Sequence, residues 1–119
     1  MGWIDCKLYV NGSVQTSTLS LSSISYSTAT SAKIGSYYTG NYLDGLIDEV
    51  SLFDSALSAS DITSIYNSGV PNDISSLNPV GWWRMGDNDG GTGTTITDQG
   101  SGSNDGTLTN GPTFSTTVP

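Results

Sequence analysis

The sequence contains no histidine and only one cysteine, Cys6, among its 119 residues. Without histidine, most zinc sites and the Ser-His-Asp and Cys-His nucleophile arrangements are excluded, and one cysteine cannot form an internal disulfide. We expect Cys6 to be a small buried or half-buried residue rather than a reactive thiol, because Lys7 is the only basic group near it. No apolar run approaches the roughly 18 residues of a membrane span, and residues 1–10 lack the charged start and apolar middle of a signal peptide.

Basic and apolar residues are also scarce. Three Lys and Arg residues stand against eleven Asp and Glu residues, so the net charge is −8. Binding to nucleic acid or insertion into an anionic membrane surface is therefore disfavoured. Hydrophobic residues make up 34% of the chain, which is low and typical of one domain with short strands, many turns and a modest core.

The segment from Gly40 to Gly69 carries the clearest local pattern. Leu46, Asp48, Val50 and Leu52 alternate with the other residues of a strand predicted over 46–53, so these four share one face. Three of them are apolar, and we expect this face to point into the core. A carboxylate on such a face is costly unless it is hydrogen-bonded, paired or bound to a metal.

A short helix is predicted after this strand. Ser58 and Asp61 fit a capping box, and Gly69 followed by Pro71 supplies a stop. An apolar stripe at helical spacing lies between them, formed by Leu57, Ile62, Ile65 and Tyr66. About three turns are unstable alone in water, so the helix must pack on a sheet.

The first forty residues predict strands and a tight turn. Residues 3–10 and 13–18 read as two strands, and Asn11-Gly12 between them is a strong signal for a type I′ hairpin turn. A further short strand is predicted over 32–35. Tyr37, Tyr38 and Tyr42 crowd the next turn. Their rings could stack on a sugar, or they could be ordinary strand and rim residues.

The second half begins with an irregular connection over 71–79 and a strand over 80–85. Trp82 shares one face of this strand with Arg84, and Trp83 lies on the other, so both indoles cannot enter one core. One of them should be covered by a loop, a neighbour or a ligand. We expect Arg84 to pair with an acidic group or to stack on an aromatic ring. A Gly-rich stretch then runs over 86–119.

Several of these stretches together resemble a known family. The order "KLYVNGSV" and then "YLDGLIDEVSLFDSALSASDITSIYNSG" resembles the closing third of a laminin G-like domain of the concanavalin A-like lectin and glucanase superfamily. The later "GWWRMGDNDGGTGTTITDQGSGSNDGTLTNGPTF" resembles the opening of such a domain. The resemblance implies an all-β fold, an antiparallel jelly-roll β-sandwich with one short α-helix.

The order of the two halves is reversed relative to the family. Residues 1–70 resemble the closing half, 71–79 form a connection, and 80–119 resemble the opening strands, packed on the first half. In the family the first and last strands are neighbours, so the resemblance implies that residues 80–85 pair with 46–53. The chain is then a permuted and shortened domain that lacks the central strands. Open edges and apolar faces favour association, so we expect a homo-oligomer.

The resemblance also implies a structural calcium ion, since members of the family often hold one. Carried onto this chain, the ligands would be Asp98 and Asn104 with Asp48 or Glu49. The alternative is that these carboxylates cap turns by accepting backbone N–H groups. Catalysis is not expected, because adjacent strand carboxylates point to opposite faces and cannot flank one bond.

Three interpretations of the function follow. The first is a carbohydrate-binding adhesion domain that uses Tyr37, Tyr38, Tyr42 or an exposed Trp82 or Trp83 to bind surface glycans. The second is a non-enzymatic structural subunit, on a virion or a cell surface, that assembles with its own copies; the sequence is similar to lectin-like domains of marine bacteriophage structural proteins. The third is a piece of a larger adhesin or glycoside hydrolase.

Overall fold

The computed structural model describes residues 4–21, 31–37 and 40–117 of the chain. These residues fall into two compact units, Met1–Leu46 and Ile47–Pro119, and each is considered by itself. Within the described residues no helix is long and apolar enough to cross a membrane.

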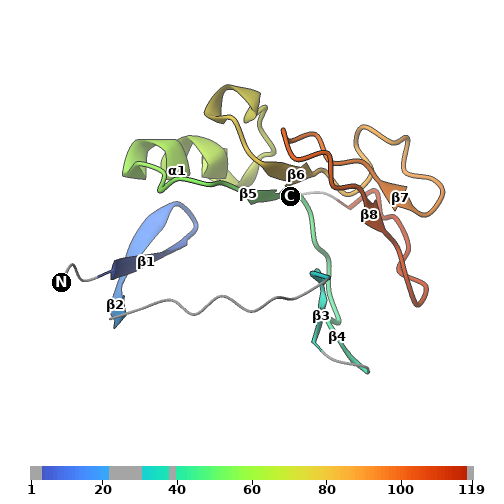
Figure 1. Cartoon of the computed structure of the whole chain (residues 1–119), viewed down its shortest axis with the longest axis horizontal. Coiled ribbons are helices and arrows are strands. Elements are labelled where there is room, and N and C mark those ends of the chain that lie inside the picture. Colours follow the sequence, from blue (N-terminus) through green and yellow to red (C-terminus); the bar gives the residue numbers. More distant parts are fainter. Residues whose placement is uncertain (1–3, 22–30, 38–39, 118–119) are drawn as a thin grey trace. The chain divides into compact units, whose positions relative to one another are not determined.

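A β-hairpin opens the first unit (Figure 1). Strand β1 (Ile4–Val10) pairs antiparallel with β2 (Ser13–Leu21), and the register shifts between Lys7 and Tyr9. Asn11 and Gly12 connect the strands with φ values of 50° and 71°. Both values are positive, as a type I′ turn requires. The predicted hairpin is confirmed, and β2 runs further than residue 18.

A second, much smaller hairpin follows in the first unit. Strand β3 (Ser36–Tyr37) pairs antiparallel with β4 (Asn41–Tyr42), and the N–H of Leu43 donates to the carbonyl of Gly35 at 2.9 Å. The prediction of a strand over 32–35 is wrong. Gly35 has a φ of 76°, a left-handed conformation that interrupts an extended chain just before β3.

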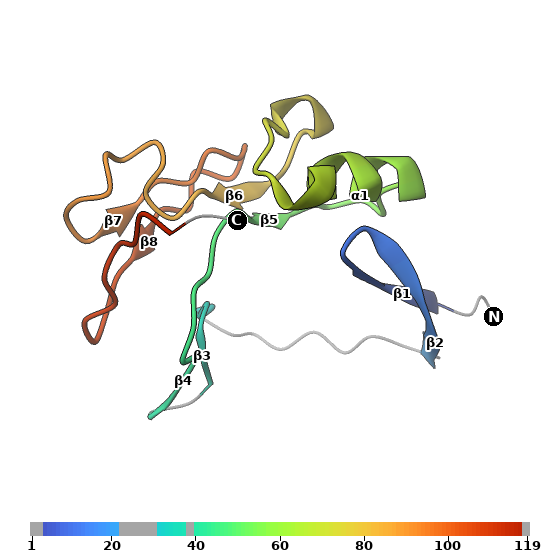
Figure 2. The same ribbon diagram turned by 180° about the vertical axis from the view of Figure 1, so that it is seen from behind.

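The second unit is organised by a pair of strands that lie far apart in the sequence. Strand β5 (Val50–Leu52) pairs antiparallel with β6 (Gly81–Trp83), so that Ser51 lies opposite Trp82 (Figures 1 and 2). On its other side β6 meets the chain at Asp98 through a single bridge from Trp83. The predicted pairing of the two stretches is confirmed.

Both strands are shorter than predicted. Glu49 has a φ of 49° and Met85 a φ of 47°, and these left-handed residues end the extended conformation before β5 and after β6. The prediction that one face of residues 46–53 enters the core is wrong. Leu46 is 65% exposed and Leu52 59% exposed.

The predicted helix is present. Helix α1 (Ala59–Tyr66) begins at Ser58, whose Oγ accepts the N–H of Asp61 while a carboxylate oxygen of Asp61 accepts the N–H of Ser58. This is the predicted capping box. The helix ends at Asn67, which takes a left-handed conformation, and not at Gly69. Two short 3-10 helices follow, η1 (Asn67–Gly69) and η2 (Ser75–Leu77), so the connection is irregular, as expected.

The core of the second unit is small. Among the described residues the buried large apolar side chains are Ile74, Trp82 and Ile96. Ile96 belongs to strand β7 (Thr95–Ile96), which pairs antiparallel with β8 (Gly106–Thr107). Each sheet in the described part of the chain has two strands. The fold is thus mostly strand with one short helix, and the jelly-roll sandwich that the resemblance implies is not confirmed.

A close backbone approach holds the 98–102 loop against β6. A Cβ on Gly100 would lie 2.7 Å from the backbone nitrogen of Gly81, a distance that requires the backbone to move. We predict that Gly100→Ala lowers the unfolding free energy by about 1–3 kcal/mol in urea titrations. Gly106→Ala is the control, since its Cβ would meet Ile96 at an ordinary 3.6 Å. Equal stability of the two variants would contradict the prediction.

Candidate functional site

Glu49 links the two strands of the central pair through its side chain. Its two carboxylate oxygens accept hydrogen bonds from Trp82 Nε1 at 2.6 Å and from Arg84 Nε at 2.7 Å. The left-handed backbone of Glu49, immediately before β5, places the side chain toward residues on and just after β6. Since the carboxylate oxygens are both engaged, Glu49 is a structural acceptor in this arrangement.

Arg84 completes this cluster. Its guanidinium carbon lies 5.2 Å from the centroid of the Trp82 ring, within the range of a cation–π contact. Nη1 donates to Asn88 Oδ1 at 3.1 Å and Nη2 to Asp87 Oδ2 at 3.2 Å. The hydrogen bond to Glu49 raises the pKa of Arg84, against the opposing effect of burial. Both parts of the prediction for Arg84 are confirmed: it pairs with acidic groups and stacks on an aromatic ring.

Asp98 is the buried carboxylate that organises the following loop. Its side chain accepts the backbone N–H groups of Trp82, Gly100 and Asn104, each at 2.8 Å. The residue is 7% exposed. Burial would raise the pKa of Asp98, but these three N–H donors outweigh it and hold the pKa below its ordinary value.

Asp48 stands in a different environment. Its Oδ1 accepts the N–H of Glu49 at 2.9 Å, while its Oδ2 is buried and receives no donor from the described residues. Burial raises the pKa of Asp48, and the nearby carboxylates of Asp87 and Glu49 act in the same direction. A carboxylate oxygen in this state costs free energy until a donor or a cation reaches it.

A hollow lies beside Asp48, between the chain entering β5 and the end of α1. Its volume is about 150 Å³, and it is lined by Asp48, Glu49, Ile65, Tyr66, Gly69, Val70 and Pro71. We call it the Asp48 hollow. Most of its lining is apolar, and the acidic residues in its wall are Asp48 and Glu49.

The four predicted calcium ligands are not assembled into one site. No group of three or more Asp, Glu, His or Cys residues within the described part of the chain is arranged to hold a metal ion. Asp98 does contact Asn104, but the contact is a hydrogen bond from the backbone N–H of Asn104 to the Asp98 carboxylate. This N–H group occupies the position beside the carboxylate that a cation would need. These residues therefore do not fit a calcium ion in this arrangement.

This geometry makes a prediction about metal removal. The melting temperature of the full chain is expected to be unchanged, within error, by a chelator and by millimolar calcium, because backbone N–H groups already occupy the Asp98 carboxylate. Differential scanning calorimetry provides the measurement. A rise of several degrees on adding calcium, absent with Asp98→Asn, would contradict it.

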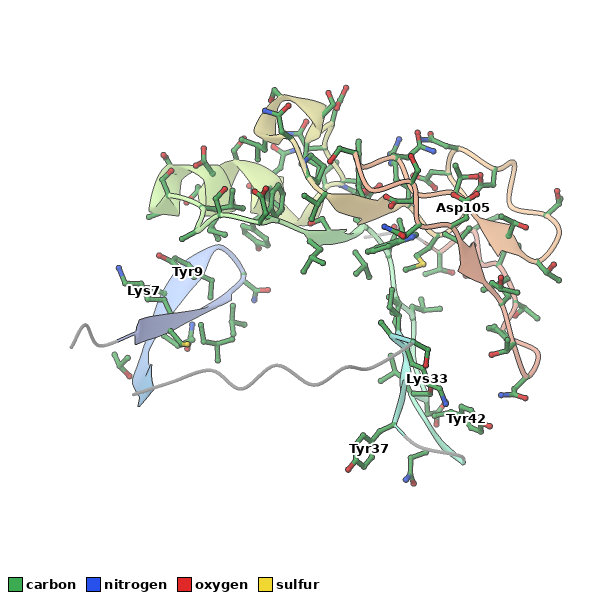
Figure 3. The ribbon with its side chains drawn as sticks, in the orientation of Figure 1. Lys7, Tyr9, Lys33, Tyr37, Tyr42 and Asp105 are labelled. Carbon is green, nitrogen blue, oxygen red and sulfur yellow. The ribbon has the colours of Figure 1, made fainter. Side chains whose placement is uncertain are left out.

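The predicted aromatic ligand-binding residues are also separated. Tyr37 is 74% exposed and Tyr42 57% exposed. They do not lie opposite each other, because Ser36 pairs with Tyr42 and Tyr37 with Asn41. Figure 3 shows the two rings directed away from each other. They cannot close on one sugar ring, and Tyr38 lies outside the described residues.

The prediction of an exposed Trp82 is wrong. Trp82 is 5% exposed, beneath Arg84 and beside Glu49. Trp83 is half-buried, and its Nε1 donates to the carbonyl of Asn104 at 2.9 Å. Trp82 therefore offers no open face for stacking in the described structure.

The sequence analysis missed the apolar residues of the hollow. Pro71 was placed in the irregular connection over 71–79, Val70 was not singled out, and only the unexplained carboxylate at Asp48 pointed toward this region. It also missed Asp87 and Asn88 as partners of Arg84. Their spacing of three and four residues from Arg84 was a usable signal, because a turn brings such residues close together.

Comparison with known proteins gives one match. A family model described as "Concanavalin A-like lectin/glucanases superfamily", laminin G type, matches residues 5–63. The matched segment contains the hairpin, β5 and the beginning of α1, and ends before β6. No curated protein and no solved structure matches the chain.

Proposed function

Residues 5–63 belong to the concanavalin A-like lectin and glucanase superfamily as a laminin G-like segment, and from this premise we propose that the chain is a non-enzymatic structural module that assembles with copies of itself. A virion or a cell surface is the proposed location. The observation that carries the proposal is the limited pairing of β5 and the exposure of one of its side chains. Among the described residues of the second unit, β5 pairs with β6 alone, and Leu52 on it is largely exposed.

Other exposed apolar residues support association. Leu8, Val10 and Val14 on the β1–β2 hairpin are each at least half exposed. Small sheets with open edges and exposed apolar side chains are stabilised when another strand or sheet covers them. A neighbouring copy would supply that cover for a domain that lacks central strands.

The oligomeric state tests the proposal directly. Light scattering coupled to size-exclusion chromatography at micromolar concentration should give a mass that is a multiple of 12.4 kDa. Leu52→Lys should shift the distribution toward the monomer, while Leu43→Lys outside the strands serves as the control. A stable monomer over the whole concentration range would remove the proposal.

A non-enzymatic role is proposed because the most suggestive pair of carboxylates is engaged elsewhere. Glu49 is held by Trp82 and Arg84, and Asp48 lies beside an apolar hollow too small for a glycan chain. Incubation with a panel of polysaccharides should release no reducing sugar.

Carbohydrate binding is the second candidate. It is supported by the lectin-like family and by the exposure of Tyr37 and Tyr42 on the β3–β4 hairpin. A glycan array separates the two proposals: signals lost in Tyr37→Ala or Tyr42→Ala would favour a lectin. The third reading, a piece of a larger adhesin or hydrolase, predicts neither ordered assemblies in electron microscopy nor a concentration-dependent mass.

A further inference from the structure

We propose that Asn110 is a site of spontaneous covalent modification, at which water converts the asparagine into aspartate and isoaspartate. The proposal does not rest on self-assembly or on carbohydrate binding. Two observations carry it. Asn110 precedes Gly111 in an exposed turn, and the residue that would close this turn with a hydrogen bond is Pro112.

The reaction proceeds through a cyclic imide formed within the chain. The backbone nitrogen of Gly111 loses its proton and attacks the side-chain carbonyl carbon of Asn110, and a new N–C bond forms as ammonia leaves. Water then adds to one of the two carbonyl groups of the ring and opens it. Cleavage of one ring bond to nitrogen gives aspartate, and cleavage of the other gives isoaspartate.

The glycine after the asparagine leaves the attack unhindered. Gly111 has no Cβ, and among the described residues beyond its immediate neighbours no heavy atom lies within 4 Å of where one would be. Its N–H group makes no hydrogen bond to the described part of the chain, so none has to break before the proton leaves. Asn110 and Gly111 are both exposed, so water and hydroxide reach them.

The sequence contains two Asn-Gly pairs, and their backbones have the same signs. The φ values are 50° and 71° at Asn11-Gly12, and 63° and 81° at Asn110-Gly111. Positive values at both residues are typical of a type I′ turn, in which a hydrogen bond joins the first and fourth residues. The two pairs therefore differ in what closes the turn, because the reacting residues are the same.

Proline removes that closure from the second turn. Its fourth residue is Pro112, which has no backbone N–H to donate, and the described residues 109–113 belong to no strand or helix. At the first turn the fourth residue is Ser13, which pairs with Val10 in the β1–β2 hairpin. The cyclic imide requires rotation of the asparagine backbone. The hairpin must therefore open before it reacts, whereas the turn at Asn110 is already open.

Contacts on both sides of the turn hold the loop without closing it. The N–H of Leu108 donates to the carbonyl of Thr94 at 2.7 Å. The ring of Phe114 lies over Gly86, where an added Cβ would be 2.7 Å from Cδ1 of the ring. Isoaspartate adds one methylene to the backbone between these contacts, and either product adds one negative charge, from −8 to −9. The modification therefore changes both the length and the charge of the loop.

Incubation of the full folded chain followed by mass spectrometry tests the proposal. Trypsin places the two asparagines in separate fragments, 8–33 and 85–119, and digestion at mildly acidic pH limits further reaction. Electron-transfer fragmentation locates each changed residue and distinguishes isoaspartate from aspartate. At neutral pH and physiological temperature, Asn110 should react at least about tenfold faster than Asn11, because only the open form of a turn reacts.

Unfolding is the control for effects of sequence alone. In concentrated urea both turns are lost, so the two asparagines should react at rates within about threefold of each other. Gly111→Ala places a Cβ beside the attacking nitrogen and should slow the reaction at Asn110 at least about fivefold, with no change at Asn11. The rate at Asn110 should rise from neutral to mildly alkaline pH, because the N–H must lose its proton.

Each contrary result overturns the proposal at a stated step. An unchanged Asn110 in the folded chain would exclude the site. Equal rates at Asn110 and Asn11 in the folded chain would show that closure of the turn has no influence, and a difference of the same size in urea would assign it to sequence alone. Aspartate formed without isoaspartate, or an undiminished rate in Gly111→Ala, would exclude the cyclic imide.

Discussion

Asp98→Ala is expected to lower the unfolding free energy of the second unit by about 4 kcal/mol. Each buried N–H group left without an acceptor costs about 1–3 kcal/mol, and the variant leaves three such groups. The variant leaves the N–H groups of Trp82, Gly100 and Asn104 without their acceptor beneath the 98–106 loop. Because small domains are stable by only about 5–15 kcal/mol, such a loss removes much of the total stability.

Urea titration monitored by tryptophan fluorescence provides the measurement. Asp98→Asn should lie between the wild type and Asp98→Ala, because an amide oxygen can still accept N–H groups while the amide nitrogen opposes another donor. Asp54→Ala, at an exposed position, should stay within about 0.5 kcal/mol of the wild type. If Asp98→Ala also stayed within about 0.5 kcal/mol of the wild type, the structural role of Asp98 would be contradicted.

The same contacts predict a pH dependence with a definite sign. The pKa of Asp98 is lowered in the folded chain, so its unfolded form binds more protons in the acid range. Its contribution to stability is therefore complete above the unfolded value of about 3.9 and is lost as the pH falls through the lower folded pKa. Asp98→Asn should show a smaller loss of stability over this range than the wild type. An identical acid dependence would contradict the assignment.

Glu49→Ala is the second large effect, expected at about 2–3 kcal/mol. It removes the acceptor of both Trp82 Nε1 and Arg84 Nε and leaves a half-buried guanidinium with fewer partners. A double-mutant cycle with Arg84→Met isolates the pair, and a coupling of at least about 0.5 kcal/mol is expected for groups in direct contact.

NMR gives an independent check on Glu49. The indole N–H resonance of Trp82 should move upfield and exchange faster in Glu49→Ala, because its strong acceptor is gone. Asp44→Ala, at an exposed position, is the control and should leave that resonance unchanged. Free energies of unfolding that agree within about 0.5 kcal/mol between Glu49→Ala and the wild type would contradict this account.

The elements with strong local signals were predicted well from the sequence. Asn11-Gly12 determines the first hairpin, because a turn with two positive φ values strongly favours asparagine followed by glycine. Ser58 and Asp61 mark the beginning of α1, because their capping hydrogen bonds join residues only three positions apart. The pairing of β5 with β6 came from the family resemblance. It could not have come from local propensity, because the strands are separated by the whole of α1 and its following connection.

The errors have a common physical cause. Alternation over 46–53 predicts one continuous strand, but hydrogen bonds of Glu49 to the distant residues Trp82 and Arg84 accompany a left-handed backbone at Glu49. The family resemblance implied Asp98 as a calcium ligand, but an acidic residue in a Gly-rich loop can either bind a metal ion or cap a turn. The choice depends on which backbone N–H groups point at the carboxylate, and sequence does not reveal that.

The central claim is that residues 50–52 and 81–83 are neighbouring antiparallel strands, although they lie far apart in the sequence. The most direct measurement is a nuclear Overhauser experiment on the full labelled chain. A cross-strand contact between the backbone protons of Ser51 and Trp82, with matching contacts between Leu52 and Gly81, is the predicted result. Backbone contacts from Trp82 to some other strand, with none to Ser51, would contradict it.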